Sequence, residues 1–453
     1  MRALEENWDL VIAGAGPAGC TLAAKVGAAG TNVLVLEKAE EPGRGRDWIV
    51  DVEKTVFDSA DVPYPVQDAL RDECESEVML SPVAGHEVTL LAAPIVPIRN
   101  GVYMRQLAAN AVEKGAEIRT GCTVLGPITE DNAVKGVRYR DINGGESTAY
   151  AHVVADCTGL VGAVRRYSLP DWGLSKDVGA SDIVLARREV RMVNVEAASA
   201  EVQKGSIRNK VRTGIVSGVG TYSTQLYYLD LDKGYIDILV GIKPNPNLPT
   251  PDDWFRQKME QWPFVGDKIF GDGGPIPIRR TWDSLVGDGL VVLGDCACQV
   301  IPAHGSGTAS ALIAADLASK TVGRALSEGR YDRSALWDYC HAFQSGRGAL
   351  LAYFDVMRKH TDTVGPKDVD KMIKYGILGA EENYSGMVPE LYELGVAGAL
   401  KKAVKGIPAL HILAGFAGAG MRANKLMKHY QEYPEKYSVQ ALSAWISGLS
   451  GLY

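Results

Sequence analysis

The feature that most constrains the fold is a glycine-rich segment near the N-terminus, WDLVIAGAGPAGCTLAAKVGAAGTNVLVLEK, at residues 8–38. An apolar run leads into Gly14, Gly16 and Gly19, which have the G-x-G-x-x-G spacing, and a helical pattern follows them. In such a strand–turn–helix unit the first glycine permits a sharp turn, the second lets the backbone approach a pyrophosphate, and the third lets helix and strand pack closely. The N–H groups and the dipole at the start of the helix favour the negative charge of the phosphates. The segment therefore predicts a dinucleotide site formed by Gly14, Ala15, Gly16, Pro17, Ala18 and Gly19.

A second apolar run, NVLVLE at residues 32–37, supports this prediction. It ends in Glu37, followed by Lys38, about twenty residues after the glycines, which is where such sites place an acid that binds a ribose hydroxyl. The glycine triplet alone would also fit a tight strand–helix turn with no ligand. The triplet, the helix and the acid together favour a dinucleotide site, but they do not distinguish NAD from FAD.

Three later segments narrow the choice of cofactor. Arg105 stands at the start of a helical pattern, and an apolar run further on leads into D-C-T-G at residues 156–159. A third apolar run, at residues 290–293, leads into Gly294 and Asp295. The glycine-rich turn PAHGSG and an alanine-rich helical pattern follow, so a helix is expected to begin near Gly307 or Thr308.

With these motifs in order from residue 8 to about residue 325, the chain resembles the FAD-dependent superfamily of para-hydroxybenzoate hydroxylase, and most of all its geranylgeranyl reductase branch. The segment GGPIPIRR at residues 273–280 resembles the stretch that this branch carries before its G-D motif. The segment HYQEYPEKY, at residues 429–437, is similar to the C-terminal region of that branch, though less specifically.

The resemblance implies FAD as the cofactor. It implies that Asp295 binds the ribityl chain, that Arg105 contacts the pyrophosphate or ribityl region, and that the backbone near Val124 touches adenine. A second acid far along the chain suits a long cofactor with polyol groups, which an NAD dehydrogenase does not need. The further residues expected to bind the cofactor are Lys38, Arg46, Thr158, Gly159, Gly305, Gly307 and Thr308.

The predicted fold is α/β, with a Rossmann-like FAD-binding domain, an antiparallel-sheet substrate domain and a helical C-terminal region. The FAD-binding domain is expected to be discontinuous, over residues 1–170 and 276–328. Between them, residues 171–275 alternate apolar and polar side chains, and STQLYYLDLDKGYIDILVGI predicts a hairpin in a β substrate domain. Residues 329–453 have mostly helical patterns.

His304 is the predicted catalytic residue, because it lies in the turn that the family places close to the flavin ring. It could donate a proton to a substrate, or it could only hydrogen-bond the nearby backbone. Cys296 and Cys298 are expected to fill space, with a redox role as the alternative. Arg44 and Arg46 fit either a pyrophosphate-binding segment or a solvated turn. No metal site is predicted, because the histidines and cysteines lack metal-ligand spacing.

Composition excludes some classes of function. The chain has 453 residues and a formal net charge of −7, which argues against a nucleic-acid partner. Seven scattered cysteines suit a reducing compartment, and neither a signal peptide nor a membrane-spanning apolar run is visible. We expect a cytoplasmic protein. Residues 399–430 mix lysines with an apolar face, which could contact a membrane surface or pack on the domain.

The leading hypothesis is an FAD-dependent oxidoreductase that reduces carbon–carbon double bonds of an apolar, isoprenoid or lipid-like substrate. Its electron donor would be NAD(P)H or a reduced electron-transfer protein. The alternatives are a monooxygenase that hydroxylates or epoxidises an aromatic or alkene substrate, and a non-catalytic flavin- or lipid-binding protein. The sequence departs from the patterns of related families in three places. The Y-x-W-x-F-P signature of typical geranylgeranyl reductases is absent, which weakens the isoprenoid assignment, and the W-x-W-x-I-P signature of halogenases is absent, which disfavours halogenation. The segment GRGRDWIVDV lacks the cysteine that is common in archaeal reductases, which argues against a mechanism that uses this thiol.

Overall fold

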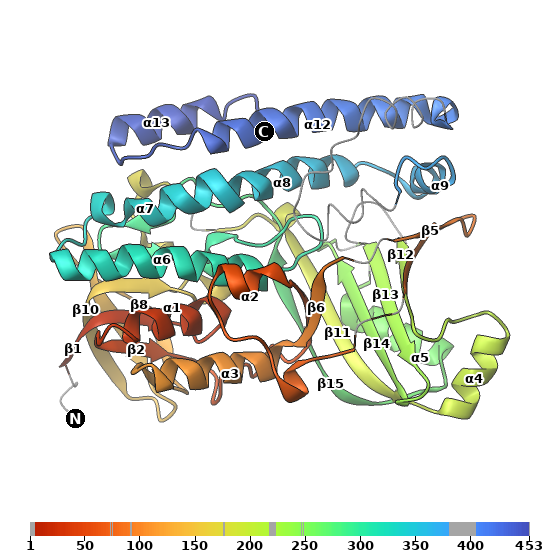
Figure 1. Cartoon of the computed structure of the whole chain (residues 1–453), viewed down its shortest axis with the longest axis horizontal. Coiled ribbons are helices and arrows are strands. Elements are labelled where there is room, and N and C mark those ends of the chain that lie inside the picture. The colour runs from red at the N-terminus through yellow and green to blue at the C-terminus, as the bar shows by residue number, and fades with distance from the viewer. Residues whose placement is uncertain are drawn as a thin grey trace.

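The structure is a computed structural model, shown in Figure 1, and it describes residues 5–72, 74, 76–90, 93–174, 177–216, 223–245, 247, 249–379 and 405–452. One half of the described chain is built on a largely parallel eight-stranded sheet, with the strand order β16-β17-β10-β1-β2-β7 and with β9 and β8 added beside β10. Its strands are β1 (Glu5–Ala13), β2 (Val33–Leu36), β7 (Glu117–Arg119), β8 (Thr123–Glu130), β9 (Ala133–Arg140), β10 (Glu146–Asp156), β16 (Val286–Gly287) and β17 (Leu290–Val292).

The predicted motifs meet at one edge of this sheet. β1 pairs in parallel with β2 and β10, and β10 pairs in parallel with β17. Because the carboxyl ends of parallel strands lie at the same edge, the glycine turn, the D-C-T-G motif and the G-D motif all open there. The helices that follow two of these turns, α1 (Pro17–Gly27) and α6 (Thr308–Glu328), pack against each other. α3 (Asn100–Glu113) packs on α1 from the other side.

The other half of the described chain is a seven-stranded sheet with the order β15-β11-β14-β13-β12-β4-β5. Its strands are β4 (Ser76–Leu80), β5 (Glu87–Thr89), β11 (Ile183–Val193), β12 (Val211–Val216), β13 (Ser223–Asp230), β14 (Tyr235–Ile242) and β15 (Val265–Pro277). The predicted hairpin is formed by β13 and β14. The sheet also takes in β4 and β5, from residues that we expected in the FAD-binding domain, and β4 pairs with β12 in parallel.

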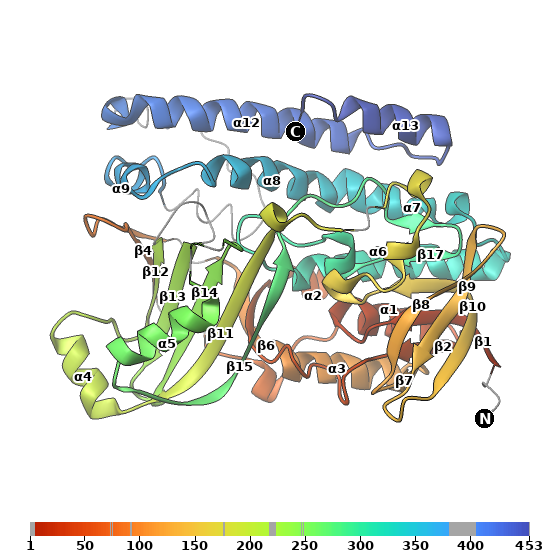
Figure 2. The ribbon, with the colours of Figure 1, turned by 180° about the vertical axis from the view of Figure 1, so that it is seen from behind.

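β3 (Ile49–Glu53) and β6 (Ile95–Arg99) form a small two-stranded sheet. In Figure 1, β6 lies between the two larger sheets. Helix α4 (Val195–Gln203) lies at the end of the seven-stranded sheet that is away from the C-terminal helices, and α5 (Pro251–Gln261) packs against the sheet, where it contacts β11 and β14 (Figures 1 and 2). α2 (Thr55–Ser59) follows β3 and contacts α6.

The C-terminal helices form layers over one edge of both sheets. They are α7 (Arg333–Phe343), α8 (Ala349–Thr361), α9 (Pro366–Lys374), α12 (Leu410–Gln431) and α13 (Val439–Gly448). A π-helical segment, Gln344–Gly348, joins α7 to α8, so the long helical pattern of the sequence is continuous but contains one bulge. In both views α12 and α13 form the outermost layer, with α7 and α8 beneath them (Figures 1 and 2). The predicted fold class is therefore confirmed.

Among the described residues, no helix combines the length and the apolar character needed to cross a membrane.

Candidate active site

A cavity of about 1380 Å³ connects the three parts of the fold. Its wall includes the glycine turn and the G-D motif of the eight-stranded sheet, β4, β11, β12 and β14 of the seven-stranded sheet, and side chains of α8, α9 and α12. Cavities that hold one drug-sized ligand measure about 300–1,000 Å³. This cavity therefore has room for a large cofactor and part of a second molecule.

The glycine turn forms one end of the cavity. Gly14 has φ +102°, and a Cβ atom there would lie 2.5 Å from the carbonyl oxygen of Cys157. A Cβ atom on Gly19 would lie 2.0 Å from the carbonyl oxygen of Gly14, so neither position accepts a side chain. α1 begins after Gly16 with no side-chain cap. Its first N–H groups are thus available to a phosphate.

Glu37 fixes this turn to the end of β2. The N–H of Ala15 donates to Glu37 Oε2 at 2.7 Å, and the N–H of Ala39 donates to Oε1 at 2.9 Å. The carboxylate also lines the cavity, so its remaining lone pairs are placed to accept from a hydroxyl group.

A second polar site lies at the G-D motif. Asp295 lines the cavity, and burial raises the pKa of its carboxyl group, an effect that the guanidinium of Arg46 opposes. α6 begins at Thr308, as the sequence predicted, and its N-terminus has no side-chain cap. A Cβ atom on Gly307 would lie 3.1 Å from Asp295 Oδ1, so the acid and the start of α6 meet at one point. Two uncapped helix starts, each beside an acid, fit the pyrophosphate and the polyol and ring portions of FAD.

All but three of the predicted cofactor-binding residues line this cavity. Ala15 and Gly19 belong to the glycine turn but not to the wall, and Arg105 lies outside it. Arg105 is 39% exposed in its side chain, and its Nη1 lies 3.9 Å from Glu41 Oε1. The cofactor contact that the resemblance implied for Arg105 thus has no support from its position in this structure.

Asp156 of the D-C-T-G motif is fully buried and organises the loop that follows β10. Its Oδ1 accepts from the N–H and the hydroxyl of Thr158, at 3.1 and 2.6 Å. Its Oδ2 accepts from the N–H groups of Val164 and Arg165, at 2.8 and 2.7 Å. The motif therefore holds Thr158 and Gly159 at the cavity wall.

Cys296 and Cys298 have no exposed surface. Burial raises the pKa of Cys298 to about 12 and that of Cys296 well above its ordinary value, so both thiols stay protonated. Protonated, buried thiols are poor nucleophiles and poor metal ligands. Among the residues that the structure describes, no cluster of His, Cys, Asp and Glu side chains could hold a metal ion.

His304 lines the cavity on the turn between Gly294 and α6. Its Nδ1 accepts a hydrogen bond from the N–H of Ser306 at 3.3 Å. The hydroxyl of Ser306 donates to the carbonyl oxygen of Asp51 at 3.0 Å, which ties this turn to β3.

Sequence reasoning missed a group of five charged side chains, which we call the charged cluster: Asp51, Glu77, Arg188, Arg212 and Asp237. Arg188, Arg212 and Asp237 are buried, and Asp51 and Glu77 are partly buried. Arg188 Nη2 lies 2.6 Å from Asp237 Oδ2, and Arg212 Nη2 lies 3.1 Å from Asp51 Oδ1. Arg212 Nη1 lies 3.8 Å from Glu77 Oε2. All of the cluster except Asp237 lines the cavity. The available signal was the presence of charges inside apolar strands, as in LARREVRM.

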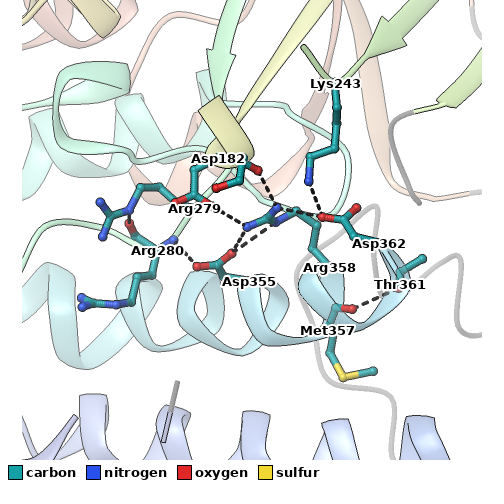
Figure 3. Close-up of polar contacts among 10 residues, drawn as sticks. Asp182, Lys243, Arg279, Arg280, Asp355, Met357, Arg358, Thr361 and Asp362 are labelled. Carbon is teal, nitrogen blue, oxygen red and sulfur yellow. Dashed lines mark hydrogen bonds and ion pairs between the residues drawn. The ribbon is translucent and has the colours of Figure 1, made fainter. Parts of the chain in front are cut away.

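The roof of the cavity is held by a second ionic network, which Figure 3 shows. Arg358 of α8 is 1% exposed in its side chain and pairs with Asp355 at 2.6 Å, Asp182 at 2.9 Å and Asp362 at 3.0 Å. Lys243, which follows β14, pairs with Asp362. The network thus connects α8 to one end of the seven-stranded sheet, where β11 begins beside the end of β14. Next to it, Phe354, Met357 and Thr361 face the cavity.

Comparison with curated proteins gives matches over nearly the whole chain. The chain is 24% identical over 452 residues to a digeranylgeranylglycerophospholipid reductase of Sulfolobus acidocaldarius, a match that spans 97% of this chain and 96% of the relative. It is 25% identical over 375 residues to digeranylgeranylglycerophospholipid reductase 2 of Methanothermobacter thermautotrophicus, spanning 81% and 91% of the two chains. No protein-family model matches.

Comparison with solved structures shows the same fold in several flavoproteins. A geranylgeranyl bacteriochlorophyll reductase-like protein of Thermoplasma acidophilum matches with a TM-score of 0.72 and 18% identity, over 91% of this chain and all of that one (100%). A flavin-dependent brominase matches with a TM-score of 0.61 and 15% identity, over 90% of this chain and 99% of that one. The resemblance predicted from the motifs is therefore confirmed: the chain is similar over nearly its whole length to the geranylgeranyl reductases and has the fold of FAD-dependent oxidoreductases.

Proposed function

We propose that this protein is an FAD-dependent reductase that saturates carbon–carbon double bonds in an isoprenoid or similar lipid-like substrate. The observation that carries the proposal is the continuity of the cavity. It runs from the glycine turn and Asp295, past the seven-stranded sheet, to apolar side chains of α8, α9 and α12. The apolar end is lined by Phe354, Met357, Val369, Met372, Ile377, Leu378, Leu413 and Phe416. Such a surface suits a long hydrocarbon chain and offers it few polar partners.

The residues at the polar end fit FAD, which supplies a hydride when it is bound in reduced form. The start of α1 would hold the pyrophosphate and Glu37 a ribose, while Asp295 and Arg46 would lie along the polyol chain. The start of α6 would place its positive dipole end near the flavin ring. The apolar walls exclude water from the reacting carbon atoms. His304, at the cavity wall, is the proton source proposed from the sequence, with a water molecule as the alternative.

The electron donor is part of the same proposal. NAD(P)H or a reduced electron-transfer protein would supply the two electrons of each cycle. The rate of flavin reduction is measured without substrate for NADH, NADPH and a reduced ferredoxin, and the compound that reduces the flavin is identified as the electron donor.

We also propose that the substrate reaches the cavity from a membrane surface beside α12. Leu410 lines the cavity and is nevertheless 62% exposed, and Ile407, one turn before it, is 66% exposed. Exposed lysines on the same helix, Lys425 and Lys428, would face anionic headgroups.

Product analysis tests the proposed reaction. FAD-loaded protein is reduced with dithionite and incubated without oxygen with a synthetic digeranylgeranyl glycerophospholipid. We expect products that have gained pairs of hydrogen atoms and no oxygen atom, measured by mass spectrometry. Oxygenated products that form only in air would support the monooxygenase alternative, whose fold relatives include an anhydrotetracycline hydroxylase. Unchanged lipid under both conditions would support a non-catalytic binding protein.

A further inference from the structure

The charged cluster on the cavity wall holds one more acid than base. It contains three carboxyl groups, Asp51, Glu77 and Asp237, and two guanidinium groups, Arg188 and Arg212. Arg188 and Arg212 are 3% and 5% exposed, so the cluster sits in a medium where an uncompensated charge is costly. These five groups together become neutral when one of the acids keeps its proton. The imidazole of His304 is a further titratable group beside them, and it contributes to lowering the pKa of Asp51.

Geometry identifies the acid that keeps the proton. Asp237 accepts from Nε and Nη2 of Arg188, at 3.0 and 2.6 Å, and Asp51 accepts from Nη2 of Arg212 at 3.1 Å. Glu77 lies 3.8 Å from Arg212, beyond hydrogen-bonding distance. The two guanidinium groups therefore neutralise Asp237 and Asp51 directly, and Glu77 is left over.

Electrostatics point the same way. Burial raises the pKa of the Glu77 carboxyl group, and the partial opposition of Arg212 does not cancel this effect. Burial would also raise the pKa of Asp51, but Arg212 and Arg188 outweigh it and lower that pKa below its ordinary value. Neighbouring acids whose pKa values are pushed apart are typical of an acid–base site. Cys74 also faces Arg212, and burial raises the pKa of its thiol, so it stays neutral.

We infer that Glu77 is the acid that protonates the substrate double bond, an inference that rests on the proposed reductase function. An isolated double bond has no carbonyl group to accept the electron pair of a hydride, so a proton must reach the second carbon as the hydride reaches the first. The π bond breaks, one C–H bond forms with the hydride of reduced FAD, and the other forms with the proton of Glu77. The two electrons would come with the hydride of reduced FAD, which would thereby be oxidised to FAD, and Glu77 would be left as a carboxylate near Arg212 until water returns its proton.

Position favours Glu77 over His304. Glu77 belongs to β4 of the seven-stranded sheet, whereas His304 belongs to the same turn as Gly305 and Gly307, which we predict to bind the cofactor. His304 Nδ1 accepts a hydrogen bond from the N–H of Ser306, so this ring nitrogen is engaged within its own turn. The substrate would thus lie between the hydride donor on one wall and Glu77 on another.

The test compares Glu77→Gln with Glu87→Gln, the same change on the neighbouring strand β5 at an exposed glutamate outside the cavity. Reduced, FAD-loaded proteins are mixed without oxygen with the digeranylgeranyl lipid, and the rate of double-bond reduction is measured against pH. We expect E77Q to lower this rate about 10²- to 10⁴-fold and E87Q to leave it unchanged. In the wild type the rate should fall as the pH rises through the raised pKa of Glu77, and E77Q should lack this fall.

Infrared spectroscopy of the oxidised protein provides a readout without turnover. The difference spectrum of wild type minus E77Q at neutral pH should contain the stretching band of a protonated carboxyl group, whereas any band of Asp295, whose pKa is also raised, cancels in the difference. Glu77→Asp keeps a carboxyl group at this position and should therefore recover part of the rate. It replaces E77Q as the test variant if E77Q binds FAD poorly. The inference is overturned if E77Q reduces the lipid within about threefold of the wild-type rate, if the band is absent, or if His304→Gln alone causes the large loss. In each of these cases the reductase function stands; a wild type that reduces no double bond overturns both.

Discussion

Replacing Arg358 by Met tests whether the ionic network over the cavity supports the fold. The guanidinium is 1% exposed and pairs with three carboxylates, at 2.6, 2.9 and 3.0 Å, while Asp355 has no exposed side-chain surface. Methionine has a similar length but no charge, so R358M leaves the buried Asp355 without its ion-pair partner Arg358 and takes one partner from Asp182 and Asp362, which are 18% and 17% exposed in their side chains. Removing one member of a buried ion pair costs about 3–5 kcal/mol. We therefore expect the free energy of unfolding to fall by about this amount, mainly through the loss at the buried Asp355, because Asp362 keeps its pair with Lys243.

Urea unfolding followed by tryptophan fluorescence and by far-ultraviolet circular dichroism measures this change. Arg324→Met is the matched control, because Arg324 of α6 forms an exposed pair with Asp338. An exposed pair contributes about 0–1 kcal/mol, so R324M should change the free energy of unfolding by no more than that. Equal effects of the two substitutions would refute the role that we assign to the buried network.

Three further outcomes are expected. Gly14→Ala should weaken FAD binding about 10- to 100-fold, measured by flavin fluorescence. At this position φ is +102° and a Cβ atom would meet Cys157, which strains the backbone by about 1–3 kcal/mol. Gly323→Ala, in an open position of α6, is the control and should not weaken FAD binding. Cys296→Ala combined with Cys298→Ala should keep both FAD and lipid reduction, and loss of reduction with FAD retained would indicate a redox role for the thiols. Ile407→Ser combined with Leu410→Ser should reduce co-flotation with anionic phospholipid vesicles about tenfold or more, since each removes a large apolar side chain from the proposed contact; unchanged flotation would contradict that contact.

The sequence predicted the architecture well because its strongest motifs are local. The glycine turn, Glu37, and the sequence Gly294–Asp295 before α6 each lie within one strand–turn–helix unit, and the parallel sheet brings those units to one edge. The hairpin of β13 and β14 was also legible, because alternation and the Asp232–Gly234 turn are contiguous.

The charged cluster could not be predicted in the same way. Glu77 and Arg212 are far apart in the sequence and become neighbours only because β4 pairs with β12 in parallel. Nothing in the residues around Glu77 indicates that this strand joins the seven-stranded sheet. For Arg105, the family resemblance implied a contact with the cofactor. In the structure its side chain lies beside Glu41, outside the cavity.

In the proposed reaction, reduced FAD in this cavity passes its electrons to a double bond of a bound lipid. Stopped-flow absorbance tests it most directly: dithionite-reduced, FAD-loaded protein is mixed without oxygen with a digeranylgeranyl glycerophospholipid or with its fully saturated counterpart. We predict that the oxidised flavin spectrum returns with the unsaturated lipid and not with the saturated one. A flavin that stays reduced with both lipids would contradict the claim.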